Sequence, residues 1–350
     1  MSDFSEGKVR RIDAVTNVIT TIAGDGSLGD KITGDGGLAT KAALGGPRDI
    51  AFDTQDNLFI STSEYVRRVD AKTNIITTIA GNGSNNNVKD GELATKGAIG
   101  PESITIDNKG NVLVVDGATE VGGKLRGALV RRIDTSGVIT SVVGNGQTFF
   151  SGEGSLATNT GLGLVRSIEI DSGGNLFISA AEIDPVNFIG FLNPRILRVD
   201  ASSKTINTFI KGNNGYQGDG GSLANASIVG IPVISFSPNG DLLLLDIKQP
   251  IAALRLVHLQ KTSGGPISTN ISISNAAYLK PNLAIDGQGF GSSGAKVVVN
   301  GTDASAFISN NTDTKLTLSG SRKKLNMRKG TNQLTVTSST GATASFQFNF

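Results

Sequence analysis

The chain has 350 residues, of which 38% are apolar and 18% are charged, and its formal net charge is +2. It contains no cysteine and one histidine, His258, which excludes disulfide frameworks, thiolate metal sites and histidine-cluster zinc sites. No run approaches the ~18 apolar residues of a membrane-spanning helix, and a glycine content about twice the usual ~7% predicts many tight turns.

A motif of the form V-R-R-V-D, followed by a run such as I-T-T-I-A-G, recurs through the first 260 residues. The aspartates that close its copies are Asp13, Asp70, Asp134 and Asp200, at intervals of 57, 64 and 66 residues. Each cycle also holds a glycine-rich loop such as Gly34–Thr40 and an apolar run such as Leu58–Ile60. One cycle therefore comprises four short β-rich runs separated by turn residues.

Four short strands per repeat, with no long helical pattern between them, are typical of β-propeller blades. Four strands each are supplied by residues 45–81, 100–144 and 164–212. Residues 231–259 supply three, and joining them to the spare run Val18–Gly24 would close a ring of four blades. The run Val9–Asp13 duplicates a strand that the last blade already has, which favours an incomplete larger ring; both arrangements stay open.

These residues resemble a known family, the NHL-type β-propellers. The segments that carry the resemblance are Gly34–Thr40, Val66–Asp70 and Ile75–Gly81, and it covers about residues 1–260. It implies the fold more specifically than the activity, since one fold hosts many activities. The family is common in bacterial secreted and surface proteins, which implies an extracellular or cell-surface location. The chain begins within a repeat and without the apolar segment of a signal peptide, so we expect an N-terminally truncated fragment.

The repeat ends near residue 260, and a glycine-containing linker is expected over residues 261–269. Residues 270–350 show an alternating all-β pattern of immunoglobulin-module length. Segments similar to the IPT/TIG immunoglobulin-like domain are Leu283–Gly291, Val297–Gly301 and Gly330–Val336. The predicted fold is therefore all-β, a β-propeller over residues 1–260 followed by an Ig-like β-sandwich. The resemblance implies a spacer or docking role for the second module.

Charge divides at the same boundary. Residues 261–350 hold nine basic and three acidic residues, whereas residues 1–260 have a net charge of −4. Much of the basic excess lies in Arg322, Lys323, Lys324, Arg328 and Lys329. These residues predict either a contact for an anionic polymer or a solvated loop, and we favour the loop because charge runs alone are weak signals. Nucleic acid is disfavoured as a partner, since no aromatic side chains interleave with the charges.

Long connections between the predicted strands indicate where a ligand would bind. Because strands alternate in direction within a blade, the short turns lie on one face and the long connections on the other. The candidate ligand-binding residues on the long-loop face are Phe188, Ile189, Phe191 and Leu192, with Tyr65 and Tyr216 from other long connections. The structural alternative is that the apolar residues of this loop form a small satellite core.

The recurring Gly-Asp-Gly loops offer weak calcium candidates, since carboxylates are calcium ligands. These are Asp35, Asp90 and Asp219. Their recurrence favours turn formation and capping instead, so we expect no metal and no cofactor. The paired arginines are expected to be one exposed and one between blades, with Asp70 or its equivalents as partners.

The sequence favours a non-catalytic binding or adhesion protein whose long-loop face meets a protein or carbohydrate ligand. No catalytic residues are assigned, since His258 has no acid or base partner at a recognisable spacing. The alternative is a propeller enzyme of the lyase or lactonase type, with a metal held by carboxylates at the channel mouth.

Overall fold

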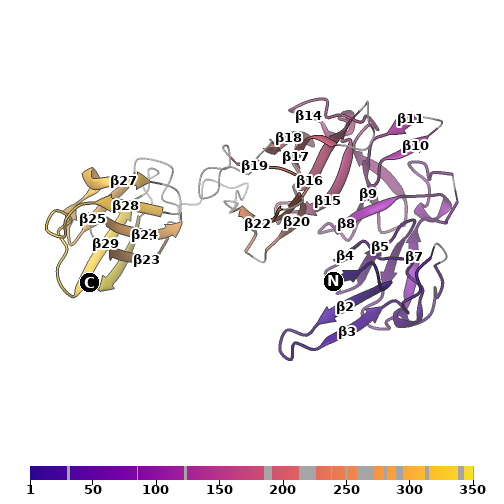
Figure 1. Ribbon diagram of the computed structural model, residues 1–350, viewed down its shortest axis with the longest axis horizontal. Helices are drawn as coiled ribbons and strands as arrows, with labels where there is room; N and C mark the ends of the chain where they lie inside the picture. The colour runs from indigo at the N-terminus through magenta and orange to yellow at the C-terminus, as the bar shows by residue number, and fades with distance from the viewer. Residues whose placement is uncertain are drawn as a thin grey trace. The chain divides into compact units, whose positions relative to one another are not determined.

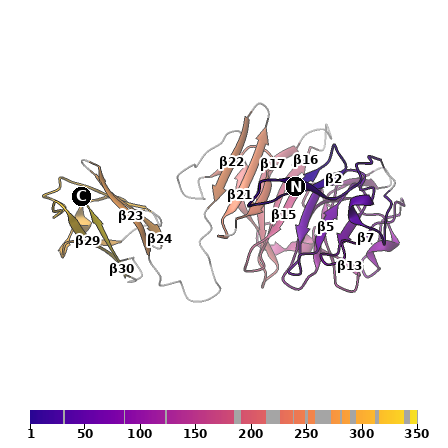
Figure 2. The same cartoon turned by 90° about the horizontal axis from the view of Figure 1, so that it is seen from below.

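β-strands make up nearly all the regular structure in this computed structural model (Figures 1 and 2). The structure describes residues 1–29, 32–84, 86–121, 124–184, 191–212, 226–237, 239–248, 251–257, 272–279, 282–288, 295–311, 315–337 and 343–349. The chain divides into two compact units, Met1–Lys261 and Thr262–Phe350. The linker predicted at 261–269 lies outside the described residues. Within these ranges, no helix has the length and apolar character needed to cross a membrane.

Three sheets built on four antiparallel strands each form the middle of the first unit, and two short strands extend the last of them to six. The second sheet in chain order comprises β4 (Asp49–Phe52), β5 (Leu58–Ser61), β6 (Val66–Val69) and β7 (Ile76–Ala80). The third comprises β8 (Pro101–Ile106), β9 (Val112–Asp116), β12 (Leu129–Ile133) and β13 (Ile139–Val143), with the small hairpin β10 (Thr119–Val121) and β11 (Lys124–Arg126) between β9 and β12. The fourth comprises β15 (Leu164–Ile170), β16 (Leu176–Ile183), β17 (Phe191–Val199) and β18 (Thr205–Gly212), flanked by β14 (Ser155–Leu156) and β19 (Ser227–Ile228).

Three-stranded sheets stand at either end of this series. The first sheet comprises β1 (Ser2–Asp3), β2 (Lys8–Ile12) and β3 (Ile19–Ala23), and the fifth comprises β20 (Val233–Phe236), β21 (Leu242–Lys248) and β22 (Ile251–Val257). In the described part of the chain β3 pairs with β2 and not with β22, so the four-bladed closure is not formed. The innermost strands β4, β8, β15 and β20 contact one another in that order, which makes an incomplete propeller ring of five sheets (Figure 1).

The hydrophobic cores of the propeller lie between neighbouring sheets. All four residues of β5 are buried, as the continuous apolar runs predict for strands covered on both faces. Between the fourth and fifth sheets the fully buried Phe177 contacts Phe209 and Phe236 edge to face, at centroid distances of 5.1 and 5.3 Å. Each sheet thus depends on its neighbours for burial, as in other repeat architectures.

The long connections that lead into the second, third and fourth sheets, here called connectors, each cover an outer strand edge on the way. Leu38 bridges Ile75 at the start of β7, and Leu93 bridges Val138 at the start of β13. In the fourth sheet β14 pairs with the start of β18 in the same manner. The glycine-rich loops therefore act as short additional strands that protect otherwise free edges.

The first arginine of the repeated V-R-R motif lies beneath this connector. Arg67 is fully buried, and its guanidinium donates a 2.6 Å hydrogen bond to Asp35 Oδ1. The second oxygen of Asp35 accepts the backbone N–H of Thr78 on β7 at 3.1 Å. Arg131 and Asp90 repeat the ion pair in the third sheet, also at 2.6 Å. A charge buried in this way requires its partner, so the pair fixes the connector on the sheet.

The second arginine behaves differently, and the sequence prediction was right for it alone. Arg68 is half-buried and donates to Asp70 at 3.2 Å, as expected. The expectation that Asp70-type residues also serve the first arginine is wrong. Side chains alternate between the faces of a strand, so Arg68 and Asp70 share a face while Arg67 points to the other, where Asp35 arrives from the connector.

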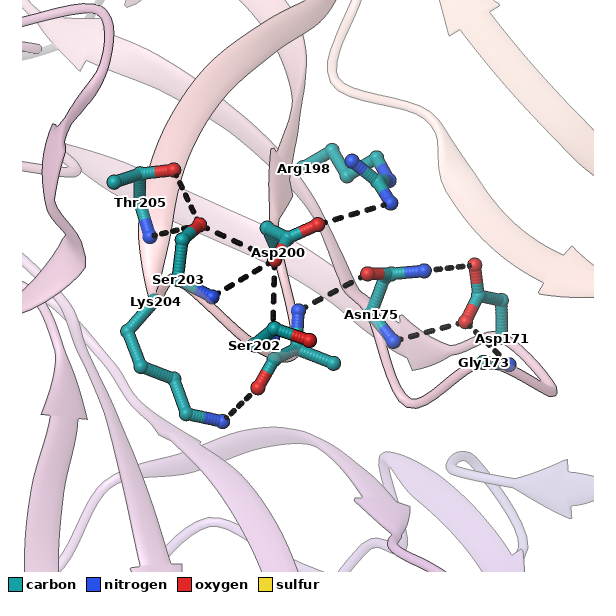
Figure 3. Close-up of polar contacts among 10 residues, drawn as sticks. Asp171, Gly173, Asn175, Arg198, Asp200, Ser202, Ser203, Lys204 and Thr205 are labelled. Carbon is teal, nitrogen blue, oxygen red and sulfur yellow. Dashed lines mark hydrogen bonds and ion pairs between the residues drawn. The ribbon is translucent and has the colours of Figure 1, made fainter. Parts of the chain in front are cut away.

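Aspartate and asparagine side chains fix the short hairpin turns, which lie on the propeller face opposite the long connections (Figure 3). Asp171 Oδ1 accepts the N–H groups of Gly173 and Asn175 at 2.9 and 2.8 Å. Asn175 in turn accepts the N–H of Ala201, which ties the first hairpin turn of the sheet to its second. Hydrogen bonds to Asp200, chiefly from the N–H groups of Ser203 and Ser202, hold the pKa of its carboxyl below the ordinary value. This face is therefore structural, as the turn residues predict.

The second unit is a β-sandwich of two four-stranded antiparallel sheets. One comprises β23 (Ser272–Leu279), β24 (Asn282–Gln288), β28 (Lys315–Ser319) and β27 (Ile308–Asn311). The other comprises β26 (Thr302–Asp303), β25 (Lys296–Val299), β29 (Thr331–Thr337) and β30 (Thr343–Asn349). Both sheets contribute fully buried side chains to one core, including Leu283 and Leu316 from the first and Val297 and Leu334 from the second. The Ig-like sandwich prediction is confirmed at the level of this architecture.

Removing the Asp35 charge should destabilise the propeller. Asp35→Asn leaves the fully buried guanidinium of Arg67 without its anion, so we expect a loss of about 1–3 kcal/mol in the free energy of unfolding, measured with urea. Asp56→Asn, at an exposed turn, is the control and should change stability by less than about 0.5 kcal/mol. Equal stability of Asp35→Asn and the wild type would contradict the assigned role.

Candidate functional site

The sequence-predicted ligand residues are only partly within the described structure. Leu192 lies in β17 and its side chain is 46% exposed. Tyr65 precedes β6 and is half-buried, and its hydroxyl lies close to Gly83, whose φ of 68° favours glycine. Phe191 pairs through its backbone with Ile183, and its side chain lies outside the description. Three other candidates also lie outside the described residues, namely Phe188, Ile189 and Tyr216.

A pocket of about 420 Å³ opens in the fourth sheet, close to Leu192 in sequence. Its walls come from the connector before β15, from the start of β17 and from the end of β18. The lining residues are Phe150, Gly152, Glu153, Asn193, Pro194, Arg195, Lys211 and Gly212. These segments are the long connections and the strand ends beside them, so the pocket lies on the face predicted to bind ligand.

Glu182 organises one wall of this pocket from the neighbouring strand β16. Its carboxylate receives the Arg195 guanidinium at 2.7 Å and the side-chain amide of Asn193 at 2.8 Å. The backbone of Asn193 is left-handed, with φ of 49°, a conformation that asparagine tolerates better than most residues. The guanidinium of Arg195 then lies over the ring of Phe150, 4.7 Å from its centroid. One carboxylate thus positions an amide, a cation and an aromatic ring.

Two charged residues of the pocket, Glu153 and Lys211, differ in the partners that the described structure gives them. Glu153 accepts the backbone N–H of Thr208 at 2.6 Å and also its hydroxyl. Lys211 is exposed, and no ion pair holds its ammonium group among the described residues. The pocket therefore offers a cation, an aromatic ring and amide and peptide groups to a polar ligand. Sequence reasoning missed these residues; the pair Phe149–Phe150 within a turn-rich connector was the available signal.

The fourth sheet also departs from the repeat at this place. Leu197 stands where Arg67 and Arg131 stand in the earlier sheets, and Glu153 takes the position of Asp35. The ion pair that fixes the other connectors is therefore absent from the fourth sheet as described, and Glu153 serves Thr208 alone. The pocket forms where the scaffold interaction has been replaced.

A second polar group, here called the inner-strand cluster, comprises Asp49, Ser103, Thr105, Glu169 and Ser235 on the four innermost strands. Asp49 Oδ2 accepts the hydroxyl of Ser103 at 2.7 Å and the N–H of the following residue at 3.0 Å. Glu169 accepts the hydroxyl of Thr105 at 3.3 Å and that of Ser235. The cluster thus connects neighbouring sheets at the centre of the arc.

Burial raises the pKa of both carboxyls of this cluster. Loss of hydration, followed by the charge of Asp49, raises the pKa of Glu169 to about 7. Burial also raises the pKa of Asp49, against the opposing hydrogen bonds from Ser103 and Ile104. A carboxyl that titrates near neutrality is a common property of catalytic acids and bases, although structural carboxyls show it as well.

The same position in the next sheets shows what Asp49 does structurally. The hydroxyl of Ser103 accepts the N–H of Ile168 at 3.2 Å, and that of Ser167 accepts the N–H of Ile234, also at 3.2 Å. Asp49 accepts the N–H of Ile104 in the equivalent bond. One side-chain oxygen at this position therefore ties each innermost strand to the next.

The weak calcium candidates have other partners. Asp35 and Asp90 bind the buried guanidinium groups of Arg67 and Arg131, and Asp219 lies outside the described residues. Within the described ranges, no group of three histidine, cysteine or acidic side chains is placed to hold a metal ion. The capping role proposed for these aspartates therefore has a physical basis in the arginine pairs.

No family model and no curated protein matches the sequence. Among solved structures, a protein of unknown function from Bacteroides thetaiotaomicron VPI-5482 is similar at 16% identity and a TM-score of 0.45, over 69% of this chain and 62% of that chain. PorZ, a surface component of the type-IX secretion system of Porphyromonas gingivalis, is similar at 13% identity and a TM-score of 0.37, over 94% of this chain and 54% of that chain.

A gluconolactonase from Xanthomonas campestris is similar at 11% identity and a TM-score of 0.35, over 69% of this chain and 82% of that chain. The matched region spans less than two thirds of the Bacteroides protein and of PorZ. Likeness at this level does not decide the activity, which depends on the residues of the site.

Glu169 should make the propeller less stable as the pH rises. Its pKa is about 7 in the folded chain and ordinarily 4.5, so the folded state binds more protons between these values and loses stability as the pH rises through them. Melting temperatures from pH 5 to pH 8 should therefore fall more steeply for the wild type than for Glu169→Gln. Glu120→Gln, at an exposed position, is the control and should follow the wild type. Parallel curves for all three proteins would contradict the assignment.

Proposed function

We propose that the chain is a non-catalytic binding protein whose fourth propeller sheet holds a carbohydrate. The observation that carries this proposal is the pocket beside Phe150, in which Glu182 fixes Asn193 and Arg195 in place. Its volume of about 420 Å³ falls within the range of small-molecule sites, ~300–1,000 Å³, and suits a ligand of a few sugar rings.

The chemistry of the pocket favours a sugar over an apolar ligand. Hydroxyl groups require donors and acceptors at fixed positions, which Asn193 and the peptide groups around Pro194 supply. Lys211 adds a positive charge suited to a carboxylated or phosphorylated sugar. A peptide segment of a protein partner, the other ligand class that the sequence suggests, would use the same groups and is separated from sugars by experiment.

The proposal includes an extracellular or cell-surface location and a spacer or docking role for the sandwich. Both follow from the resemblance to NHL-type propellers and IPT/TIG modules seen in the sequence. The proposal thus assigns recognition to the propeller and attachment or spacing to the sandwich.

An enzyme of the lactonase or lyase type is the second candidate, favoured by the inner-strand cluster. There Glu169, with a pKa of about 7, exchanges protons at neutral pH and lies close enough to Asp49 for the two charges to interact. The hydrogen bonds that these carboxyls accept give them a structural task already, which is why binding is preferred. Lactone hydrolysis by the full chain that is lost in Glu169→Gln and retained in Phe150→Ala would reverse this order.

Replacement of Phe150 should weaken sugar binding. The full chain is applied to an array of neutral and acidic oligosaccharides, and Phe150→Ala should lower the affinity for the bound glycans at least tenfold, since a half-buried aromatic ring of the pocket is lost. Phe149→Ala is the matched control, because Phe149 is its 50% exposed neighbour and does not line the pocket. Melting temperatures confirm that both variants fold.

Two outcomes would contradict the proposal. Equal glycan binding by Phe150→Ala and the wild type would place the sugar site elsewhere. Absence of binding to every glycan, together with Phe150-dependent binding to a peptide library, would assign the pocket to a protein partner.

A further inference from the structure

The basic segment of the sandwich, between β28 and β29, is anchored from below. Leu325 is fully buried and Met327 is 6% exposed, and both belong to the hydrophobic core of the sandwich. The cations on either side of them are exposed: Arg322, Lys323, Lys324, Arg328 and Lys329. The charges therefore stand on a segment whose apolar residues are inserted in the core.

Three asparagines, here called the asparagine clamp, hold the backbone of this segment. They are Asn300, Asn326 and Asn332. The side-chain amide of Asn326 donates to the carbonyl of Val299 at 3.2 Å and to the hydroxyl of Thr302 at 2.9 Å. Its backbone carbonyl accepts the amide of Asn300 at 2.8 Å, so the two residues bind each other's loops.

Asn332 completes the clamp from within the core. Its side chain is fully buried and accepts the N–H of Arg328 at 2.7 Å, while its amide donates to the carbonyls of Arg328 and Gly330, both at 2.9 Å. Asn300 donates to the same Asn332 oxygen at 2.8 Å. The buried side chain of Asn332 has both its oxygen and its amide bonded, and such a network is rigid, so the backbone that carries the cations is preorganised.

The cations themselves have few internal partners. Among the described residues, no ion pair within 4.0 Å joins Lys323, Lys324, Arg328 or Lys329 to an acidic side chain. The part of the chain to which they belong, residues 261–350, carries nine basic and three acidic residues. Holding exposed like charges together on a rigid backbone costs free energy that an anionic partner would recover.

We propose that this segment, Ser321–Gly330, binds an anionic polysaccharide, a polymer with regularly repeated carboxylate or sulfate groups. A membrane surface would call for an apolar wedge, and the apolar residues of the segment point into the core. Single-stranded nucleic acid would call for aromatic platforms, and the segment contains no aromatic residue. Charge on a fixed backbone suits a polymer recognised through its anions. The site lies in the second unit and does not depend on the proposed sugar pocket of the propeller.

The test compares two double variants that remove the same charge from the sandwich. Binding of the full chain to dextran sulfate and to polygalacturonate is measured by biolayer interferometry at several salt concentrations, with neutral dextran as the blank. Lys323→Gln with Lys324→Gln should weaken binding at least tenfold and reduce its salt dependence. Lys296→Gln with Lys315→Gln, also exposed, should change it less than twofold.

A third variant separates preorganisation from charge. Asn326→Gly removes the side-chain bonds of the clamp but tolerates the left-handed φ of 52°, and it leaves the net charge unchanged. We expect at least threefold weaker binding with the cations intact. A near-wild-type melting temperature would show that this variant folds.

Three results would overturn the proposal. Equal losses in the two double variants would reduce the effect to net charge. Tighter binding to single-stranded DNA, or to phosphatidylserine vesicles, than to either polysaccharide would assign the segment to another class of partner. Binding unchanged by Lys323→Gln with Lys324→Gln would remove the site altogether.

Discussion

The attachment of the connectors to the outer strands of the second, third and fourth sheets is the constraint on which the propeller depends. A blade on its own exposes an apolar face and an outer strand with unpaired backbone groups. Leu38 pairs with that edge, and Asp35 reaches the buried guanidinium of Arg67 and the backbone of β7 together. One connector thus covers a strand edge, neutralises a buried charge and fixes the spacing between two sheets. The innermost strands add a second set of ties through Asp49 and the serines at its equivalent positions.

A fixed scaffold makes departures from the repeat informative. In the fourth sheet Leu197 replaces the buried arginine, so an apolar side chain fills the space and no carboxylate is needed to neutralise a charge there. Glu153 lines the pocket instead of pairing with a buried arginine. The longer β16–β17 hairpin brings Glu182 beside Arg195. Departures from a structural pattern are common at functional sites. In the described residues, the fourth sheet lacks the arginine–aspartate pair of the second and third sheets.

The sequence predicted those features that its repeated motifs and its alternation of apolar and polar residues encode. Strands, turns, the two modules and the structural short-turn face follow from local patterns in the chain. The partner of Arg67 could not be predicted, because Asp35 lies 32 residues away and arrives by way of the connector. The pocket depends on a cross-strand contact between Glu182 and Arg195 past an irregularity in the strand register, which no local pattern reveals. The asparagine clamp likewise joins residues 26 and 32 positions apart.

The two proposed sites rest on opposite uses of charge, and this separates their physics. In the pocket the guanidinium of Arg195 is already paired with Glu182, so this arginine contributes through short-range contacts that dissolved salt hardly screens. In the sandwich the hydrogen bonds of the asparagine clamp hold the backbone, and the lysine side chains are exposed to solvent. Attraction between those lysines and a polyanion acts over about a Debye length and weakens as salt is added. A chain with an acidic propeller and a basic sandwich can therefore hold a polymer through one unit while the other selects a ligand by shape.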